Sequence, residues 1–493
     1  MVRLLIANRG EIAIRIIRAC REARIESVAV YSDADAGAPH VSAADRALRI
    51  GPAPAPESYL SIPALIEAAH ASGADAVHPG YGFLSENAAF ARACEAAGLI
   101  FVGPPTDAIE RMGSKIAARE LARSAGVPVV PGITPPYQTD GALAEAARAI
   151  GYPVLVKAAA GGGGRGMRTV GDDRDAHELI PAARREAAAA FGDGTLYVER
   201  LIERPRHVEI QVMGDAHGNL VHLFERECSV QRRHQKIVEE SPSPSLAPPV
   251  RAAMGAAAVA SARAAGYRNA GTVEFLLEGE GDAARFYFLE MNTRLQVEHP
   301  VTEAVAGVDL VLAQLLVAAG ERLPWSQDSL IQRGHAIECR IYAEDPANGF
   351  LPQAGPLRLY REPRGPGIRV DAGVVEGNTI TVNYDPLLAK LIVSAESRDA
   401  AIERAVAALR EYAVLGIRTN IPFLIRLLGH PEFRAGRLHT GFVDAHLGEL
   451  SSRGPVPAEA LAAAATLPAA GGQVTAAARS APDPWSTLTG WGR

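Results

Sequence analysis

Two glutamates on neighbouring strands are the first residues in this sequence that could do chemistry. The runs Gly271–Leu277 and Arg285–Asn292 are apolar and are joined by a short segment of Gly, Glu and Asp, the pattern of a β-hairpin. Glu274 and Glu290 lie at equal distances from the centre of that segment, so the hairpin should pair them. Two like charges on an apolar hairpin repel each other, and Mg²⁺ bound to substrate phosphates would relieve this repulsion. A pair that faces solvent is the alternative.

Polar residues then occupy every second position from Glu290 to Glu298. Acid, amide, cation, amide and acid alternate with Met, Thr, Leu and Val. If this segment is extended, all five polar side chains project from one face. Glu298 could then serve as a general base, with Arg294 as the anchor for an anionic substrate. A solvent-facing strand would not need this order of side chains.

A glycine-rich loop follows the predicted strand Pro153–Lys157. The four glycines from Gly161 to Gly164 leave backbone N–H groups free to surround phosphate oxygens, and Lys157 can reach the same phosphates. The loop has neither the ending of a Walker A motif nor the position of a dinucleotide fingerprint. We expect a mobile loop that closes over a nucleotide, with a flexible hairpin tip as the alternative.

The segment from Glu225 to Glu240 is a basic cluster with acidic residues on both sides. The acidic flanks argue against a nucleic-acid patch. Gln231, His234 and Lys236 within it suit a triphosphate or an anionic intermediate.

Lysine is rare in this chain. Only four of the 50 Lys and Arg residues are lysines, namely Lys115, Lys157, Lys236 and Lys390. A lysine is a compact charge on a thin stem and can enter a narrow phosphate site that the wide fork of arginine cannot. The first three lie in polar or glycine-rich segments and favour nucleotide contacts, whereas Lys390 has no predicted role. The loop His78–Asn87 and Arg340 are weaker signals.

Composition favours a globular enzyme. The 493 residues allow roughly two to four domains. A net charge of −6 gives no broad attraction to nucleic acid or to an anionic membrane. The four cysteines are scattered without metal-like spacing, which suggests a reducing compartment and a role as apolar fillers. There is no leader-like segment and no bilayer-length apolar run, so we expect a cytoplasmic protein.

The elements that must position these residues are strands alternating with helices, which predicts an α/β and α+β protein. Strand–helix–strand units predict a doubly wound N-terminal domain over 1–112. A proline-rich connector (113–132) precedes a small unit (133–203) around the glycine loop. A larger mixed region covers 204–445. Residues 446–493, rich in Ala, Gly, Pro and Ser, are predicted to be a linker or a partly disordered tail.

These segments together resemble biotin carboxylase, a member of the ATP-grasp superfamily, as found in acyl-CoA carboxylase α subunits. The resemblance covers about residues 2–445 and rests on Ile6–Ala13, His78–Asn87, the glycine loop, Arg206–Gln211, Gln231–Lys236, Glu290–Glu303 and Tyr384–Pro386. It implies an ATP-grasp fold after the N-terminal domain, with 133–203 as a mobile lid and a C-terminal mixed domain.

The resemblance also implies a reaction. ATP phosphorylates bicarbonate to carboxyphosphate, and the CO₂ released is captured by biotin on a carrier protein, as the first half-reaction of an acyl-CoA-type carboxylase. The implied cofactors are ATP, Mg²⁺ or Mn²⁺, and the carrier's biotin. The implied partners are a biotin carboxyl carrier protein or domain and a carboxyltransferase, in a homodimer or a larger complex. The chain contains no Met-Lys-Met biotinylation site, so the biotin belongs to another part or another polypeptide.

Site residues follow from the resemblance position by position. Glu298 matches the base that deprotonates bicarbonate, Arg340 the cation that stabilises the biotin enolate, and Arg294 and Lys236 further catalytic positions. Positions that bind ATP are Lys115, Lys157, Gly161, Gly162, Gly163, Gly164, Met167, Glu199, His207, Gln231, His234 and Leu276. Arg294, Gln296 and Val297 match bicarbonate contacts, and Glu274, Glu290 and Asn292 match the metal site.

Two other functions stay open. One is an ATP-grasp ligase that activates a different carboxylate as an acyl phosphate. The other is an inactive, nucleotide-binding subunit that scaffolds a carboxylase.

Overall fold

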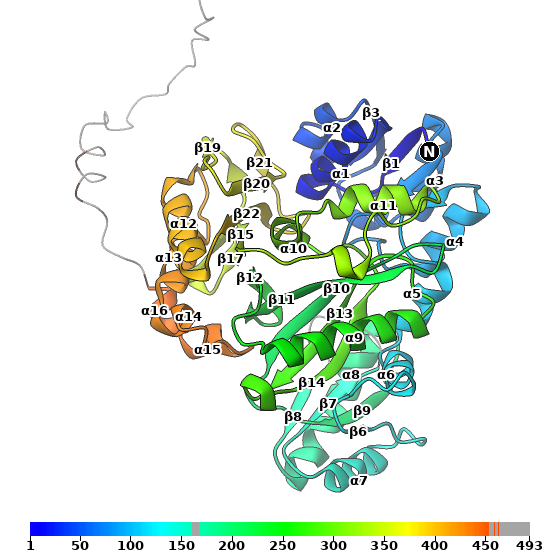
Figure 1. Ribbon diagram of the computed structural model, residues 1–493, viewed down its shortest axis with the longest axis vertical. Helices are drawn as coiled ribbons and strands as arrows, with labels where there is room; N and C mark the ends of the chain where they lie inside the picture. The colour runs from blue at the N-terminus through cyan, green and yellow to red at the C-terminus, as the bar shows by residue number, and fades with distance from the viewer. Residues whose placement is uncertain (160–166, 453–457, 459–461, 463–493) are drawn as a thin grey trace, which may run out of the picture. The chain divides into compact units, whose positions relative to one another are not determined.

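The computed structural model describes residues 1–159, 167–452, 458 and 462. All the elements below lie within Met1–Ser451 (Figure 1). The N-terminal domain is a parallel sheet in the order β3-β2-β1-β4-β5. Its strands are β1 (Arg3–Ile6), β2 (Glu26–Ser32), β3 (Arg46–Gly51), β4 (Ala76–His78) and β5 (Ile100–Phe101), and its helices are α1 (Gly10–Glu22), α2 (Pro39–Ala43), α3 (Ile62–Ser72) and α4 (Ala88–Ala96), with short 3₁₀ turns at Asp33–Asp35 and Ala55–Glu57.

Helices cover this sheet on both faces, which confirms the predicted doubly wound domain. Leu4 packs with α1, while Leu5 packs in the second core with α3 and α4. The strand order reverses between β1 and β4, and ligand sites of such sheets lie beyond the strand ends at that point. There the side chain of Asn8 donates to the carbonyl oxygens of Pro79 (2.7 Å) and Tyr81 (2.8 Å), so the two loops are joined.

The predicted connector over 113–132 contains a helix. After α5 (Thr106–Gly113), the side chain of Ser114 caps α6 (Lys115–Ser124) by accepting from the backbone of Ala117. Ala118 and Ala122 are buried against the eight-stranded sheet described below. Small apolar residues at helical spacing therefore make α6 part of the core rather than a linker.

The small unit after the connector is an antiparallel sheet covered by two helices. The strands are β6 (Gly132–Ile133), β7 (Val154–Ala158), β8 (Arg168–Val170) and β9 (Leu196–Arg200), in the order β6-β9-β7-β8, and the helices are α7 (Asp140–Ile150) and α8 (Asp173–Phe191). Alanines of both helices fill its core. The strands and helices predicted for this unit are confirmed, but Gly161 to Gly164 lie outside the described residues.

An eight-stranded antiparallel sheet forms the centre of the remaining chain, in the order β14-β13-β10-β11-β12-β15-β22-β20. These strands are β10 (Arg206–Gly214), β11 (Leu220–Arg232), β12 (Gln235–Ser241), β13 (Asn269–Glu278), β14 (Arg285–Asn292), β15 (His335–Tyr342), β20 (Ile368–Ala372) and β22 (Leu387–Ala395). Helix α9 (Pro248–Ala264) packs against β10, β11 and β13 on one face, as Figure 1 shows. The other face carries the polar residues described below.

Shorter elements complete this region. They are α10 (His299–Ala306), α11 (Leu310–Ala318), α12 (Arg398–Glu411), α13 (Ile421–Gly429), α14 (Pro431–Arg434), α15 (Phe442–Ala445), α16 (Leu447–Leu450), the strands β16 (Glu344–Asp345), β17 (Leu351–Pro352), β18 (Gly355–Pro356), β19 (Leu359–Arg361), β21 (Thr379–Ile380) and β23 (Ala413–Leu415), and 3₁₀ turns at Gly281–Ala283, Gln327–Ser329 and Pro346–Asn348. The predicted tail began at 446, but α16 belongs to the folded body because Leu450 is buried in the core of α12 and α13.

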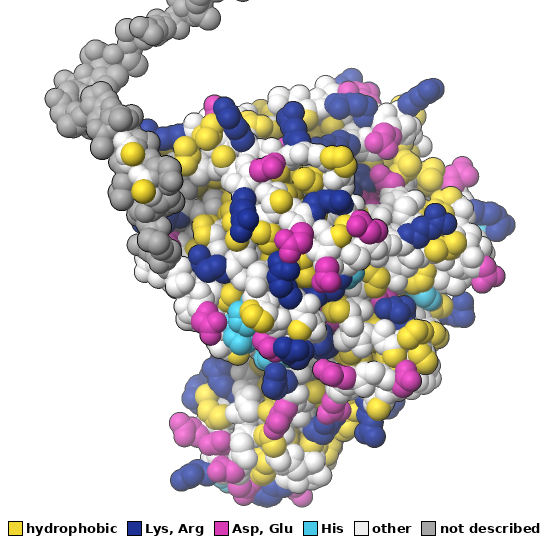
Figure 2. All heavy atoms as spheres, turned by 60° about the vertical axis from the view of Figure 1, so that its left-hand side comes forward, with side chains coloured by type: hydrophobic (Ala, Val, Ile, Leu, Met, Phe, Trp, Pro, Cys, Tyr) yellow, Lys and Arg dark blue, Asp and Glu magenta, His cyan; other side chains and the backbone are white. Residues whose placement is uncertain are grey.

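The distribution of surface charge and the burial of the cysteines agree with what the composition predicts. Basic and acidic side chains are interspersed over the face shown in Figure 2. All four cysteines are buried and unpaired, as predicted for apolar fillers. Within the described residues, no single helix is long and apolar enough to cross a membrane, although the bent pair of α10 and α11 meets the length and composition criteria jointly.

Candidate active site

The hairpin of β13 and β14 pairs Glu274 directly with Glu290, as predicted from their spacing. Asn292 lies at the end of β14, opposite Thr272. Burial and the Glu274 charge raise the pKa of Glu290. A cation beside both carboxylates would therefore be stabilised.

The next strand of the sheet, β10, adds polar residues at every second position. Val208 and Ile210 pack under α9, so His207, Glu209 and Gln211 face the other way. Glu209 lies opposite Glu274 on one side and opposite Arg226 of β11 on the other. The antiparallel register thus assembles a row of charges across four strands.

Lys236, at the start of β12, connects three of these carboxylates. Its Nζ donates to Glu209 Oε2 (2.6 Å), Glu274 Oε1 (2.9 Å) and Glu298 Oε1 (2.6 Å). Burial opposes its charge, but the carboxylates raise the pKa of Lys236 well above its ordinary value. The ammonium is therefore fixed and charged between the predicted metal ligand and the predicted base.

Arg226, the β11 member of this row, is fully buried and uses all five of its N–H donors. It binds Glu209 Oε1 (2.5 Å) and Gln296 Oε1 (2.5 Å). The remaining donors reach Gln211 (2.7 Å), Thr302 (3.0 Å) and Thr272 (3.0 Å). Its planar fork therefore joins four separate segments at the floor of the site.

The polar segment from Glu290 to Glu298 is not one extended strand, which corrects the expectation from its alternation. Strand β14 ends at Asn292, and the chain turns through a loop into α10, which begins at His299. The polar side chains are nevertheless held at the site, by residues of neighbouring strands and of the loop that carries Glu86. Gln296 donates to Glu274 Oε1 (2.9 Å), and Arg294 binds Glu86 (2.9 Å) and Asn292 Oδ1 (3.2 Å).

Glu298 lies between two cations. Its Oε1 accepts from Lys236 and its Oε2 from Arg340 (3.0 Å), and the side chain is 2% exposed. Burial raises its pKa, but Lys236 and Arg340 outweigh that effect and hold the pKa of Glu298 below the ordinary value. Arg340 also binds Glu239 (2.6 Å). The predicted base and the predicted enolate-stabilising cation are thus in direct contact.

A cavity of about 420 Å³ adjoins these residues. It is lined by most of the predicted ATP positions: Lys115, Lys157, Met167, Glu199, His207, Gln231, His234 and Leu276, together with Glu274 and Glu290. Arg233 and His234 form the tight turn between β11 and β12 with positive φ angles of 49° and 66°. The hairpin that carries Gln231 and Lys236 therefore has its tip at the cavity.

Within the cavity, Lys157 and Glu199 form a buried ion pair at 3.1 Å, and Arg119 also contacts Glu199. Burial and the Lys115 cation lower the pKa of Lys157, an effect that the Glu290 charge opposes. His207 lies 3.0 Å from Glu274, whose charge raises the histidine's pKa despite its burial. The cavity wall therefore carries several cations on the side of the two metal-site glutamates.

Arg226, Glu209 and Glu239 were missed as site residues by sequence reasoning. The alternation of His207, Glu209 and Gln211 with apolar residues in β10 was a usable signal for Glu209. Arg226 and Glu239 stand among other charged residues, so their burial could not be read locally. Their roles depend on which strand lies beside which.

The donor set fits a divalent cation. Glu274, Glu290 and Asn292 offer carboxylate and amide oxygens, which Mg²⁺ and Mn²⁺ prefer, next to a cavity lined by lysines. Burial and the Glu274 charge raise the pKa of Glu290, and Lys115 offsets this effect only in part. These three residues would hold the ion.

Three family models match the chain in succession. They are the biotin carboxylase N-terminal domain at residues 1–109, the ATP-binding domain of the carbamoyl-phosphate synthase L chain at 114–326, and the biotin carboxylase C-terminal domain at 338–445. The chain is 52% identical over 453 residues to the biotin carboxylase of Halalkalibacterium halodurans, covering 92% of this chain and 99% of that protein.

Longer proteins and solved structures match as well. The mitochondrial methylcrotonoyl-CoA carboxylase subunit alpha of Rattus norvegicus is 51% identical over 451 residues, and the chain spans 63% of its length. The biotin carboxylase domain of Hydrogenobacter thermophilus 2-oxoglutarate carboxylase, a dimer in complex with MgADP, ADP and bicarbonate, aligns with a TM-score of 0.88 at 45% identity, covering 92% of this chain and 99% of that one. The chain belongs to the biotin carboxylase family.

Proposed function

We propose that this chain carboxylates biotin on a carrier protein, with ATP and bicarbonate, as the first half-reaction of an acyl-CoA-type carboxylase. The observation that carries the proposal is Glu298, a buried carboxylate between Lys236 and Arg340. Lys236 also binds Glu274, which lines a nucleotide-sized cavity. Glu298 can remove a proton from bicarbonate, and its neighbour Arg340 can stabilise the enolate of biotin that forms later.

The cations of the cavity bind the triphosphate. Lys115, Lys157 and His207 line the cavity, and Lys236 connects the lining residue Glu274 to Glu298. Their fixed positive charge stabilises the transferring phosphoryl group without reorganisation. Glu274, Glu290 and Asn292 would hold a Mg²⁺ or Mn²⁺ ion, which would supply further neutralisation of the phosphate charge.

Arg294, Gln296 and Val297 bind bicarbonate, and Glu298 removes its proton. Because both oxygens of Glu298 accept from cations, the carboxylate is ionised and fixed in orientation before the substrate arrives. Deprotonation makes the bicarbonate oxygen a better nucleophile toward the γ-phosphorus. The carboxyphosphate that forms as ADP leaves breaks down to CO₂ and phosphate, and the ureido N–H proton of biotin passes to that phosphate. Arg340, whose guanidinium lies beside Glu298, stabilises the resulting enolate of biotin, which attacks CO₂.

The proposed partners follow from the lack of a Met-Lys-Met biotinylation site in this sequence. A biotin carboxyl carrier protein or domain must supply biotin, and a carboxyltransferase must consume carboxybiotin. A homodimer or a larger carboxylase complex in the cytoplasm is the setting that we propose.

The function is tested by ATP turnover with free biotin and with candidate acids. We expect ADP release to require bicarbonate and to rise when biotin is added. Turnover triggered equally well by acetate or an amino acid would favour a different ATP-grasp ligase. Nucleotide binding without any turnover would favour an inactive scaffold and contradict the proposal.

The metal site makes a separate prediction. Replacing Glu290 by glutamine (E290Q) should raise the Mg²⁺ concentration for half-maximal turnover by about tenfold or more, because one of two carboxylate ligands is lost. The matched control is E278Q on β13, since Glu278 pairs with the partly exposed Arg200 instead. Its Mg²⁺ dependence should match that of the wild type. An unchanged Mg²⁺ requirement in E290Q would remove Glu290 from the metal site.

A further inference from the structure

Lys390 is the one lysine that the proposed mechanism leaves unused. It lies in β22, directly opposite Arg340 of β15 in the antiparallel register, and is fully buried. It is not part of the lining of the nucleotide cavity. The free-energy cost of desolvating a fully buried ammonium must be offset by attractive contacts, so the contacts of Lys390 indicate its role.

The partners of Lys390 come from three segments that are far apart in the sequence. Its Nζ donates to the carbonyl oxygen of Val297 (2.8 Å) and lies 3.2 Å from Glu11 Oε1 in the first turn of α1. Asp371 of β20 is 3.9 Å away. Burial opposes the charge, but Glu11, Glu338 and Asp371 raise the pKa of Lys390 overall.

The contact with Val297 reaches the catalytic loop at its centre. Val297 stands between Gln296, which binds Glu274, and the base Glu298. Strand β14 has already ended at Asn292, so no sheet ladder holds this part of the backbone. A displacement of the Val297 carbonyl would move Glu298 relative to Lys236 and Arg340.

We propose that Lys390 is a positioning residue for the carboxylation of biotin, because its ammonium fixes the Val297 carbonyl and so sets the place of Glu298. The inference rests on the proposed function. Among the side-chain contacts described for Lys390, none reaches Glu298, Arg340 or the lining of the nucleotide cavity, so the Val297 carbonyl is its link to the base. Displacements of about 1 Å at reacting groups cost on the order of 100-fold in rate, which is the scale of effect that a lost anchor can have.

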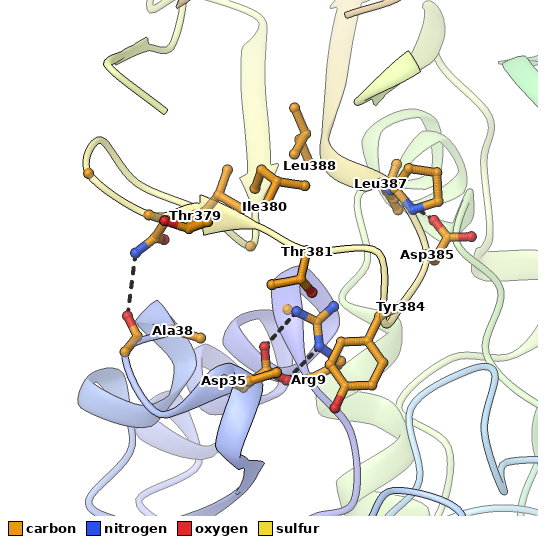
Figure 3. Close-up of a pocket in the computed structure, with 18 residues that line it drawn as sticks. Arg9, Asp35, Ala38, Thr379, Ile380, Thr381, Tyr384, Asp385, Leu387 and Leu388 are labelled. Atoms are coloured by element: carbon orange, nitrogen blue, oxygen red, sulfur yellow. Dashed lines mark hydrogen bonds and ion pairs between the residues drawn. The ribbon is translucent and has the colours of Figure 1, made fainter. Parts of the chain in front are cut away.

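A second contact between the N-terminal domain and the chain just before β22 provides a matched control. In Figure 3, Arg9 lies between Asp35 and the ring of Tyr384, beside a cavity of about 400 Å³. The guanidinium is 4.5 Å from the ring centre, and the Tyr384 hydroxyl donates to Ala53 O (2.6 Å). None of the contacts described for Tyr384 reaches the loop that carries Val297.

The test removes the Lys390 ammonium together with the Glu11 carboxylate. The double variant K390M/E11Q deletes the ammonium together with its nearest carboxylate, so no lone charge of that pair stays buried. Using the full chain and free biotin, we expect the bicarbonate KM to rise and kcat to fall by about tenfold each. The dissociation constant for ADP should stay within about twofold, and Y384F should match the wild type in all three values.

The outcomes separate the two proposals. A wild-type chain without bicarbonate-dependent turnover contradicts the proposed function. An active wild type with an equally active K390M/E11Q contradicts only the role of Lys390, as does a Y384F variant with the same losses. If the double variant does not fold, K390R replaces it, because a wide guanidinium cannot keep both the Val297 and Glu11 contacts in a closed site. An unchanged bicarbonate KM in K390R would overturn the inference.

Discussion

Replacing Glu298 by glutamine should reduce bicarbonate-dependent ATP turnover by about 10³-fold. Glutamine has the same shape but cannot take a proton. Its amide nitrogen would also face one of the two donors that Glu298 now accepts from, Lys236 or Arg340. Both the base and the local charge balance are lost at once.

The control for E298Q is a second carboxylate on the same arginine. Glu239 binds Arg340 but not Lys236, and burial, reinforced by the Glu298 charge and opposed by Arg340, raises the pKa of Glu239 to about 7. Glutamine therefore mimics a form that the wild type already populates, and E239Q should lose no more than about tenfold in turnover. ADP titration should give the same affinity for both variants and the wild type. Near-normal turnover by E298Q would remove Glu298 as the base.

The sequence was sufficient to predict contacts between segments that follow one another along the chain. The pairing of Glu274 with Glu290 agrees with the midpoint of the predicted hairpin, although the ladder nearer the turn is offset by one residue, because a register shift separates this pair from the pair of Phe275 with Phe288. The doubly wound domain follows from repeated strand–helix–strand units. In both cases the neighbours in space are also neighbours along the chain.

Sequence reasoning failed where the contacts depend on distant segments. The alternation from Glu290 to Glu298 selected the right side chains for the wrong reason. Glu290 and Asn292 lie in β14, but Gln296 and Glu298 reach Arg226 and Lys236 from the loop that follows it. The contacts of Arg226 depend on β10 lying between β11 and β13. No periodicity within one strand encodes that order.

Lys390 illustrates the same limit. Its place in β22 was an apolar pattern with one cation, and nothing nearby in the sequence suggested a partner. The partners Glu11 and Val297 are far away along the chain. The scarcity of lysine assigned no role to Lys390, and only the fold identifies its contacts.

Replacing Arg226 by methionine (R226M) should destabilise the protein by about 3–5 kcal/mol and abolish turnover in whatever fraction folds. Arg226 is fully buried, and all five of its donors are used. Methionine fills a similar volume but leaves the Gln211, Thr272 and Gln296 oxygens without this donor. Each buried group without a partner costs roughly 1–3 kcal/mol. Gln296 would also lose the contact that holds it under Glu274.

The measurement is the midpoint of urea unfolding, followed by circular dichroism, together with the bicarbonate KM. R49M is the control, because Arg49 forms an ion pair with Asp33 in which both side chains are more than half exposed. Exposed pairs of this kind contribute little, so the R49M midpoint should equal that of the wild type. The variant R226K keeps the charge but has a narrower reach and fewer donors, so it should fall between R226M and the wild type in stability and still lose turnover. If R226M unfolded at the wild-type midpoint with an unchanged bicarbonate KM, the floor of the site would have to be held by the sheet ladders alone.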